Sequence, residues 1–235
     1  MPIHYNYTVQ GAIYNSIDKE LAAFLHDQGF TVGSRNFKMF SFSRLNGSFR
    51  IQDKSNTITF ADEVRLVISS PINDFCQSLV NILLTRGFVL FGENRVKVKK
   101  VYLKKMEVSG EKVVVKTLSP IVLYSTLLRP DGRKYTCYFQ PGDPDYEHLL
   151  AENLRKKYQA IYGKDAPWGD VKVKSIGRPK LAVIKYKDFI IKGYSGKLEL
   201  RGPQELLQIG VDSGLGSKNS QGFGCVEIEE VKQKE

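Results

Sequence analysis

The sequence predicts an α+β protein that consists of two units in tandem. A length of 235 residues favours two domains of about 110 residues each over a single one. Segments with helical spacing of apolar residues alternate with β-branched and aromatic runs that have strand spacing. In the second half their order is strand, helix, strand, strand, helix, strand, which is the ferredoxin-like plan. We expect two such units, residues 1–109 and 110–235, with the border at the composition shift Ser109-Gly110.

The first unit opens with helical spacing from Tyr7 to His26. Polar residues at 15–18 interrupt the pattern and offer a new N-cap at Asp18. The segment is therefore either one bent helix or two short ones.

Strands and a second helical segment follow in the first unit. Runs at 37–42, 55–60 and 64–68 alternate as strands do and should form hairpins. Pro71 then opens a helix that ends at Gly87, and a lysine-rich strand is expected at 96–108. Residues 1–4 are too short for an opening strand, so we expect the first unit to lack it. Either the chain begins late or the sheet has lost an edge strand, which would invite pairing with a second copy of the chain.

The second unit is more regular. A β-branched run begins at Val113 and continues to Tyr124, before the turn at 130–132. A helix is expected at 144–162, strands at 171–176, 181–186 and 189–200, a last helix after Gly202-Pro203, and a closing strand at 226–228.

Charge and cysteine content limit the class of partner. The net charge of +10 and the pI near 9.4 fit a polyphosphate partner such as a nucleic acid better than an acidic small molecule, although a lysine-rich solvated surface would give the same composition. The three cysteines have no spacing typical of a zinc site or a disulfide framework. Neither a signal peptide nor a transmembrane run is evident, so we expect a cytoplasmic protein without membrane contact.

A glycine-rich stretch near the C-terminus, Gly210–Gly224, favours anion binding. Its glycines allow positive φ and close approach of backbone amides to an anion, and Lys218 adds a mobile charge. A Walker loop is excluded because Ser217 stands before the lysine, and a dinucleotide fingerprint because Asn219 replaces its third glycine. The alternative is a flexible connection between the last helix and the last strand.

The sequence offers few side chains that could act as an acid or a base in catalysis, and only three of them are histidines. His26 ends the first helical region, whereas the other two histidines fit solvated positions. A straight helix would place Tyr14 and His26 about 120° apart, and a break would bring them together. RNA supplies its own 2′-hydroxyl nucleophile, so its cleavage needs a proton acceptor, a proton donor and a positive charge. Tyr14, His26 and Lys38 could supply these groups.

Two ferredoxin-like units in tandem resemble paired RNA-recognition modules, although the sheets lack their aromatic signature. A more specific resemblance covers nearly the whole chain. The sequence resembles the CRISPR-associated repeat-processing endoribonucleases, the Cas-six family. It does so through Tyr5-Asn6-Tyr7, Gln10 to Asn15, Leu25-His26, Lys38 to Ser43, Gly214-Leu215-Gly216 and Asn219 to Gly224.

The resemblance implies an endoribonuclease that cuts the repeats of precursor CRISPR RNA without metal or cofactor, leaving a 5′-hydroxyl and a 2′,3′-cyclic phosphate. Tyr14, His26 and Lys38 match the catalytic triad of the family, with the acid and base roles of Tyr14 and His26 left open. The glycine stretch would either contact the RNA backbone or support the fold near the domain junction. The residues expected there are Gly214, Gly216, Lys218, Asn219, Gly222, Phe223 and Gly224.

Two other functions stay open on the sequence alone. The chain could be a protein of the same fold that binds repeat RNA, as part of an effector complex with other subunits, and cuts it slowly or not at all. It could instead be an enzyme acting on a small phosphate ester, which would need little affinity for RNA.

Overall fold

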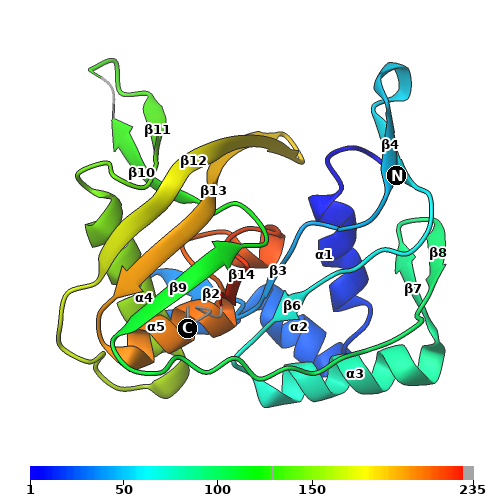
Figure 1. Ribbon diagram of the computed structural model, residues 1–235, viewed down its shortest axis with the longest axis horizontal. Coiled ribbons are helices and arrows are strands. Elements are labelled where there is room, and N and C mark those ends of the chain that lie inside the picture. Colours follow the sequence, from blue (N-terminus) through cyan, green and yellow to red (C-terminus); the bar gives the residue numbers. More distant parts are fainter. Residues whose placement is uncertain (129, 230–235) are drawn as a thin grey trace, which may run out of the picture.

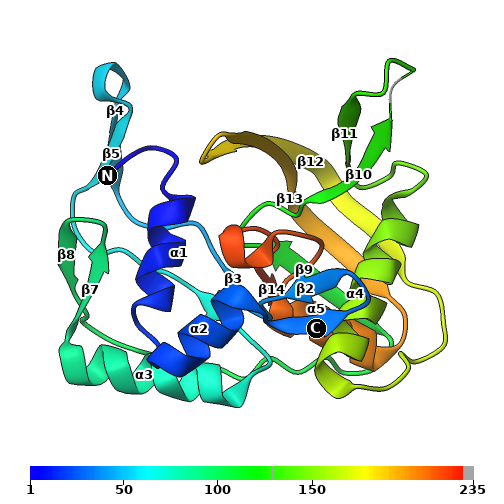
Figure 2. The ribbon, with the colours of Figure 1, turned by 180° about the vertical axis from the view of Figure 1, so that it is seen from behind.

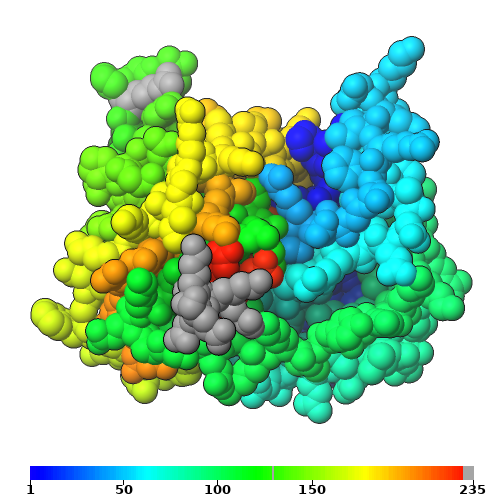
Figure 3. Space-filling model, viewed as in Figure 1, coloured from blue at the N-terminus to red at the C-terminus, as the bar shows by residue number. Residues whose placement is uncertain are grey.

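A computed structural model describes residues 1–128 and 130–229. The two halves of the chain lie side by side, with the N-terminal half on the right of Figure 1 and the C-terminal half on the left. Their surfaces meet along a seam in the space-filling view (Figure 3). Each half has its own main apolar core, one built from residues between Val9 and Phe91 and the other from residues between Val108 and Val226. The border between residues 109 and 110 stays a prediction.

The C-terminal half has the strand order of a ferredoxin-like sheet, β12-β13-β9-β14, and all neighbouring strands are antiparallel. In chain order the plan is β9 (Lys112–Thr117), α4 (Tyr146–Tyr162), β12 (Lys172–Tyr186), β13 (Phe189–Arg201), α5 (Gln204–Ser213) and β14 (Val226–Ile228). An extra hairpin, β10 (Leu123–Leu128) with β11 (Lys134–Phe139), is inserted before α4. The order of helices and strands agrees with the one that the sequence predicts. The strands expected at 171–176 and 181–186 are, however, one strand, β12, with a register shift between Ile176 and Lys180.

One face of that sheet carries the C-terminal core. Helices α4 and α5 pack there, on the side turned toward the viewer in Figure 2. The fully buried side chains of Leu150 and Leu154 on α4 meet Leu206 and Leu207 on α5 and the strand residue Leu200. Burying a leucine side chain contributes roughly 1.5 to 3 kcal/mol, so these contacts fix the sheet beneath both helices.

The opening helical region is two helices, α1 (Asn6–Tyr14) and α2 (Lys19–Asp27). Asp18 caps the second, because its side chain accepts hydrogen bonds from the amides of Glu20 (2.9 Å) and Leu21 (3.2 Å). The prediction of a break with a new N-cap at Asp18 is confirmed.

The strands of the N-terminal half form short separate pairs. These are β1 (Phe30–Val32) with β2 (Arg35–Phe37), β3 (Ser41–Phe42) with β6 (Ile68–Ser69), β4 (Phe49–Gln52) with β5 (Thr57–Phe60), and β7 (Phe88–Phe91) with β8 (Asn94–Lys97). A short 3₁₀ turn, Asp53–Ser55, joins β4 to β5, and α3 (Asn73–Arg86) packs beneath, ending at Gly87 as predicted. The predicted α+β class with tandem ferredoxin-like units is confirmed.

Three predicted strands of this half are wrong in extent. The run at 64–68 forms an isolated bridge at Arg65, and β6 covers only Ile68 and Ser69. The run at 37–42 is interrupted at Met39, whose positive φ of 51° separates β2 from β3. The expected strand at 96–108 ends at Lys97, and β7, which pairs with it, was not predicted. The residues after Lys97 follow an extended path with no strand assigned, and the lysines there face solvent.

Residues 1–3 lie antiparallel beside β5, and no strand is assigned to them. The amide of Ile58 donates to the backbone oxygen of Met1, and the amide of Ile3 donates to that of Asn56, both at 2.9 Å. The pairing amounts to a single bridge, Pro2 to Thr57. Within the described residues no helix is long and apolar enough to cross a bilayer.

Candidate active site

A cavity of about 400 Å³ lies where the two halves meet. Its walls come from α1, the end of α2, the segment after β2, the tip of the β12–β13 hairpin and the glycine stretch. The tip of that hairpin reaches toward α1 in both ribbon views (Figures 1 and 2). The side chains that line the cavity are mainly tyrosines and lysines: Tyr7, Gln10, Tyr14, His26, Lys38, Tyr186, Lys187, Phe189, Ile191, Lys218, Ser220 and Gln221.

The break between α1 and α2 places Tyr14 beside His26. Their ring centroids are 5.8 Å apart with planes at 78°, an edge-to-face contact. Phe40 packs against the other side of Tyr14, with centroids 5.5 Å apart, and holds the phenol in place. The expectation that a helix break would bring the two rings together is correct.

Asp27 fixes the orientation of the His26 ring. Its carboxylate lies 2.8 Å from Nδ1 of His26, and both side chains are more than 70% exposed. A carboxylate can only accept a hydrogen bond, so Nδ1 carries the proton, and the lone pair of the neutral ring lies on Nε2. Sequence reasoning missed Asp27, although its position next to His26 was a usable signal.

Lys38 reaches the same cavity from the segment that joins β2 to β3. Its ammonium donates to the backbone oxygen of His26 at 2.7 Å. Partial burial lowers the pKa of Lys38, and the charge of nearby Asp27 opposes this shift. The lysine is therefore a cation beside the two rings, held by the last turn of α2.

Burial raises the pKa of Tyr14 to about 12, with a further contribution from Tyr186. At neutral pH the phenol therefore keeps its proton and acts as a hydrogen-bond donor. Tyr186 belongs to the C-terminal half, and its hydroxyl is hydrogen-bonded to the side chain of Gln10 on α1. Tyr186 reaches the cavity through a contact between distant parts of the chain. No local sequence pattern could indicate this contact.

Lys218 is the one cavity residue that the sequence predicted in the glycine stretch. It adopts a left-handed conformation, with φ of 61°, before the 3₁₀ turn η2 (Asn219–Gln221). Its ammonium lies 5.3 Å from the ring centroid of Tyr124, and the residue lines the cavity.

The four predicted glycines of this stretch are buried, and Phe223 is fully buried. The neighbouring amides are already paired inside the protein: that of Leu215 donates to Gly224, that of Gly224 to Pro120, and that of Ser217 to Val122. A Cβ on Gly222 would lie 2.6 Å from both Asn6 and the Phe42 ring, in the N-terminal half. This geometry favours the second expected role, support of the fold at the junction, for the glycines and Phe223.

A buried lysine holds the glycine stretch. The ammonium of Lys157, on α4, donates to the backbone oxygen of Gly214 (2.5 Å) and to Oδ1 of Asn219 (2.8 Å). The Asn219 amide in turn donates to the oxygens of Leu215 and Phe223, both at 3.1 Å. Burial lowers the pKa of Lys157 to about 7. Asn219 is thus a structural clamp, and its partner Lys157 had no sequence signal beyond a helical position.

Two family models match the chain and show which protein family it belongs to. Residues 1–102 match the model described as CRISPR-associated protein Cas6, N-terminal, and residues 103–228 match the one described as CRISPR associated protein Cas6, C-terminal. The chain belongs to the Cas6 family.

Proteins with similar sequences or structures match nearly the whole length of the chain. A Methanocaldococcus jannaschii protein named CRISPR-associated endoribonuclease Cas6 1 is 31% identical, covering the whole chain and 90% of the relative. A Pyrococcus horikoshii protein named endoribonuclease-like protein Cas6nc is 26% identical, covering 97% of the chain and 93% of the relative. A structure of a Cas6-related gene product from Pyrococcus furiosus shares the fold, with a TM-score of 0.82 at 23% identity, and covers the whole chain and 93% of its own.

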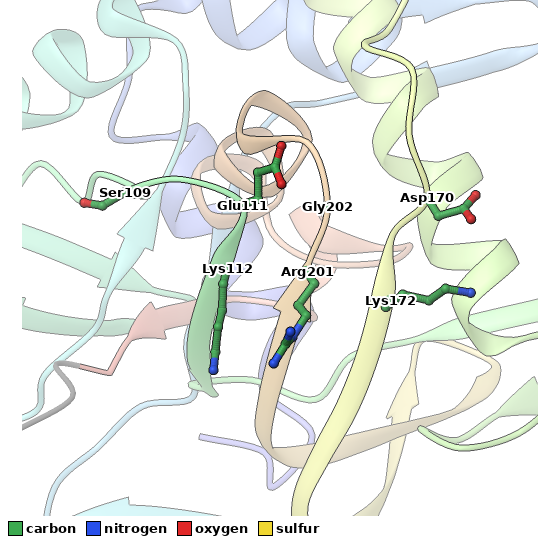
Figure 4. Close-up of a pocket in the computed structure, with 7 residues that line it drawn as sticks. All are labelled: Ser109, Glu111, Lys112, Asp170, Lys172, Arg201 and Gly202. Carbon is green, nitrogen blue, oxygen red and sulfur yellow. The ribbon is translucent and has the colours of Figure 1, made fainter.

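A second cavity of this Cas6 chain, of about 420 Å³, lies at the other end of the β12–β13 hairpin. Lys112 and Arg201 lie side by side there, with Glu111 turned away from them (Figure 4). Both cations are 2.9 Å from the carboxylate of Glu199. Because these charges are already paired, the cavity at the junction is the better candidate site.

The described part of this Cas6 chain contains no cluster of three His, Cys, Asp or Glu side chains that could hold a metal ion. That the cleavage reaction needs no metal ion stays a prediction, because the arrangement of side chains does not test it.

Proposed function

We propose that the chain is an endoribonuclease that cuts precursor CRISPR RNA within its repeats through attack by the 2′-hydroxyl. One observation carries the proposal: Tyr14, His26 and Lys38 line a single cavity, which Lys218 borders from the other half of the chain. The relatives named as Cas6 endoribonucleases support the same activity. An imidazole, a phenol and an ammonium are the groups that this reaction needs.

His26 serves as the base in the proposed mechanism. Its Nε2, which has the lone pair when Asp27 holds the proton on Nδ1, takes the proton of the 2′-hydroxyl. The 2′-oxygen then attacks the phosphorus, and the bond to the 5′-oxygen breaks.

Tyr14 serves as the donor. A phenol with a pKa of about 12 stays protonated at neutral pH, yet it is a stronger acid than the 5′-hydroxyl that forms, so proton transfer to the departing 5′-alkoxide is downhill. Lys38 stabilises the extra negative charge of the phosphorane. The products are a 2′,3′-cyclic phosphate and a 5′-hydroxyl.

Lys218 and the glycine stretch take different parts in this proposal. Lys218 contacts an RNA phosphate, because its ammonium borders the cavity. Gly214, Gly216, Asn219, Gly222, Phe223 and Gly224 bind RNA only indirectly, by fixing Lys218 and the junction. Effector-complex subunits, a second copy of the chain and a cytoplasmic location stay predictions.

The second candidate is a Cas6 protein that binds repeat RNA without cutting it. The relative named endoribonuclease-like protein Cas6nc favours keeping this alternative. The presence of all three side chains in one cavity favours the enzyme.

The test uses end-labelled RNA that carries a CRISPR repeat from the genome encoding the chain, incubated with the protein in EDTA. We expect a single cut with a 2′,3′-cyclic phosphate end, and no cut when the nucleotide before the scissile bond is 2′-deoxy. Tight binding without cleavage would establish the binding protein instead. Absence of both binding and cleavage would overturn both and point to a small phosphate ester.

A further inference from the structure

The tip of the β12–β13 hairpin extends beyond its own sheet. β12 and β13 have 15 and 13 residues, whereas β9 has six and β14 three. The tip contacts the N-terminal half instead: the amide of Lys185 donates to Nδ1 of His4 at 3.3 Å, and the hydroxyl of Tyr186 bonds to Gln10. The hairpin thus closes one wall of the active-site cavity from the other half of the chain.

One phenyl ring at this tip is left uncovered. Phe189 pairs with Tyr186 in the strand register and shares a face of the hairpin with Ile184 and Ile191. Tyr186, Ile184 and Ile191 are buried, whereas Phe189 is 70% exposed although it lines the cavity with His26. The apolar face of the hairpin therefore runs out over the cavity and ends in an aromatic ring that the protein does not cover.

The turn of the same hairpin adds a cation to the cavity. Lys187, in the turn, has a φ of 52°, which costs about 1 to 2 kcal/mol for a residue other than glycine. Its ammonium lies 4.6 Å from the ring centroid of Tyr7 and lines the same cavity. A two-residue hairpin turn requires a positive φ at this position, and here the position is occupied by a lysine whose side chain lines the cavity.

We propose that Phe189 is the stacking platform for an unpaired base that flanks the scissile phosphate, and that Lys187 contacts the phosphate of that nucleotide. The inference rests on the proposed function and adds a determinant of specificity to it. Proteins recognise single-stranded RNA by stacking splayed bases on aromatic rings and by placing cations along the backbone. Phe189 presents only a π-face, so it selects an unpaired nucleotide rather than a particular base.

If Phe189 had a purely structural role, Phe189→Ala would lower the melting temperature. The stacking role predicts a melting temperature close to that of the wild type, because a side chain that is 70% exposed contributes little to the core. Ile190→Ala is the matched control, because Ile190 is the adjacent residue, is 54% exposed and points to the opposite face of the hairpin.

The experiment places 2-aminopurine, one position at a time, on either side of the cut that wild-type protein makes. A 2′-deoxy substitution before the cut prevents cleavage during the titration. At one position we expect wild-type protein to quench the fluorescence through stacking. Phe189→Ala should abolish the quenching and weaken binding by about 5- to 150-fold, while Phe189→Trp and Ile190→Ala retain both. An abasic nucleotide there should weaken wild-type binding similarly and Phe189→Ala binding no further.

Failure of the inference and failure of the proposed function have different signatures. Quenching that Phe189→Ala leaves unchanged, or equal effects of Phe189→Ala and Ile190→Ala, would overturn the stacking role while cleavage by the wild type stands. Wild-type protein that does not cut the unmodified repeat at all would overturn the proposed function itself.

Discussion

The rings of Tyr14 and His26 form an edge-to-face contact with centroids 5.8 Å apart, although the two residues belong to different helices. This contact and the half-buried phenol together define a proton donor beside a base. Tyr14→Phe should remove the donor and leave the contacts of the ring with His26 and Phe40 in place.

We therefore expect Tyr14→Phe to slow single-turnover cleavage by about 10²- to 10⁴-fold, with the dissociation constant for 2′-deoxy RNA unchanged. The rate and the affinity are measured on the same RNA. A rate within a factor of three of the wild type would show that the hydroxyl has no role in proton transfer.

Lys38 gives the cleavage reaction an alkaline limit. Because partial burial lowers its pKa, the ammonium loses its proton at a lower pH than an exposed lysine would. The charged form is the active one, so the rate should fall as the pH rises through that lowered pKa. Tyr14, with a pKa of about 12, stays protonated over the same range.

Lys38→Arg should retain measurable cleavage and move this alkaline fall to higher pH, because a guanidinium stays charged throughout. A pH–rate profile of both proteins between pH 6 and 10.5 provides the check. Identical alkaline limbs would assign the fall to another group.

Buried Lys157 should make stability depend on pH. Its pKa falls from 10.5 in the unfolded chain to about 7 in the folded protein. Between these values the unfolded chain binds more protons, so the free energy of unfolding contributed by Lys157 rises with pH and is smallest below pH 7. The slope is at most about 1.4 kcal/mol per pH unit.

Lys157→Met leaves the oxygens of Gly214 and Asn219 without this donor and should destabilise the protein by about 2 to 5 kcal/mol at pH 9. The penalty should shrink toward pH 6. Urea unfolding at both values measures it, with Lys156→Met, on the exposed side of α4, as the control. A penalty that is equal at both pH values would contradict the buried, largely neutral lysine.

Gly222 is expected to tolerate no side chain. Its φ is +86°, and a Cβ would lie 2.6 Å from both Asn6 and Phe42. Gly177 has a similar φ of +82° but open space around it. Substitution of Gly177 therefore measures the cost of the positive φ alone.

Gly177→Ala should cost about 1 to 2 kcal/mol, and Gly222→Ala about 2 to 5 kcal/mol, because the second also forces the two halves apart. Chemical denaturation of both variants measures the difference. Equal losses would show that the junction yields easily and that the glycine is needed for its φ alone.

Local chemistry explains what the sequence could predict. Asp18 follows a polar interruption and precedes an apolar periodicity, so the break between α1 and α2, and with it the meeting of Tyr14 and His26, was predictable. The C-terminal sheet was predictable for a similar reason, because β12 and β13 are long and β9 contains the β-branched run Val113-Val114-Val115.

The missed features depend on contacts between distant segments. β8 ends at Lys97, and among the described residues no neighbouring strand pairs with the lysine-rich segment that follows at 99–105, so this part of the expected strand is a connection without strand pairing. Tyr186 and Phe189 reach the cavity only because the hairpin crosses to α1. The amides of the glycine stretch looked available in the sequence, whereas folding pairs that of Gly224 with Pro120 and that of Ser217 with Val122.

The measurement that tests the central claim most directly is the single-turnover rate of His26→Ala on repeat RNA in EDTA, compared with its affinity for the 2′-deoxy RNA. We predict a rate lower by about 10²- to 10⁴-fold, with an affinity and a melting temperature like those of the wild type, because His26 is exposed and acts on the proton of the 2′-hydroxyl. A variant that cuts the same bond at close to the wild-type rate would contradict the account.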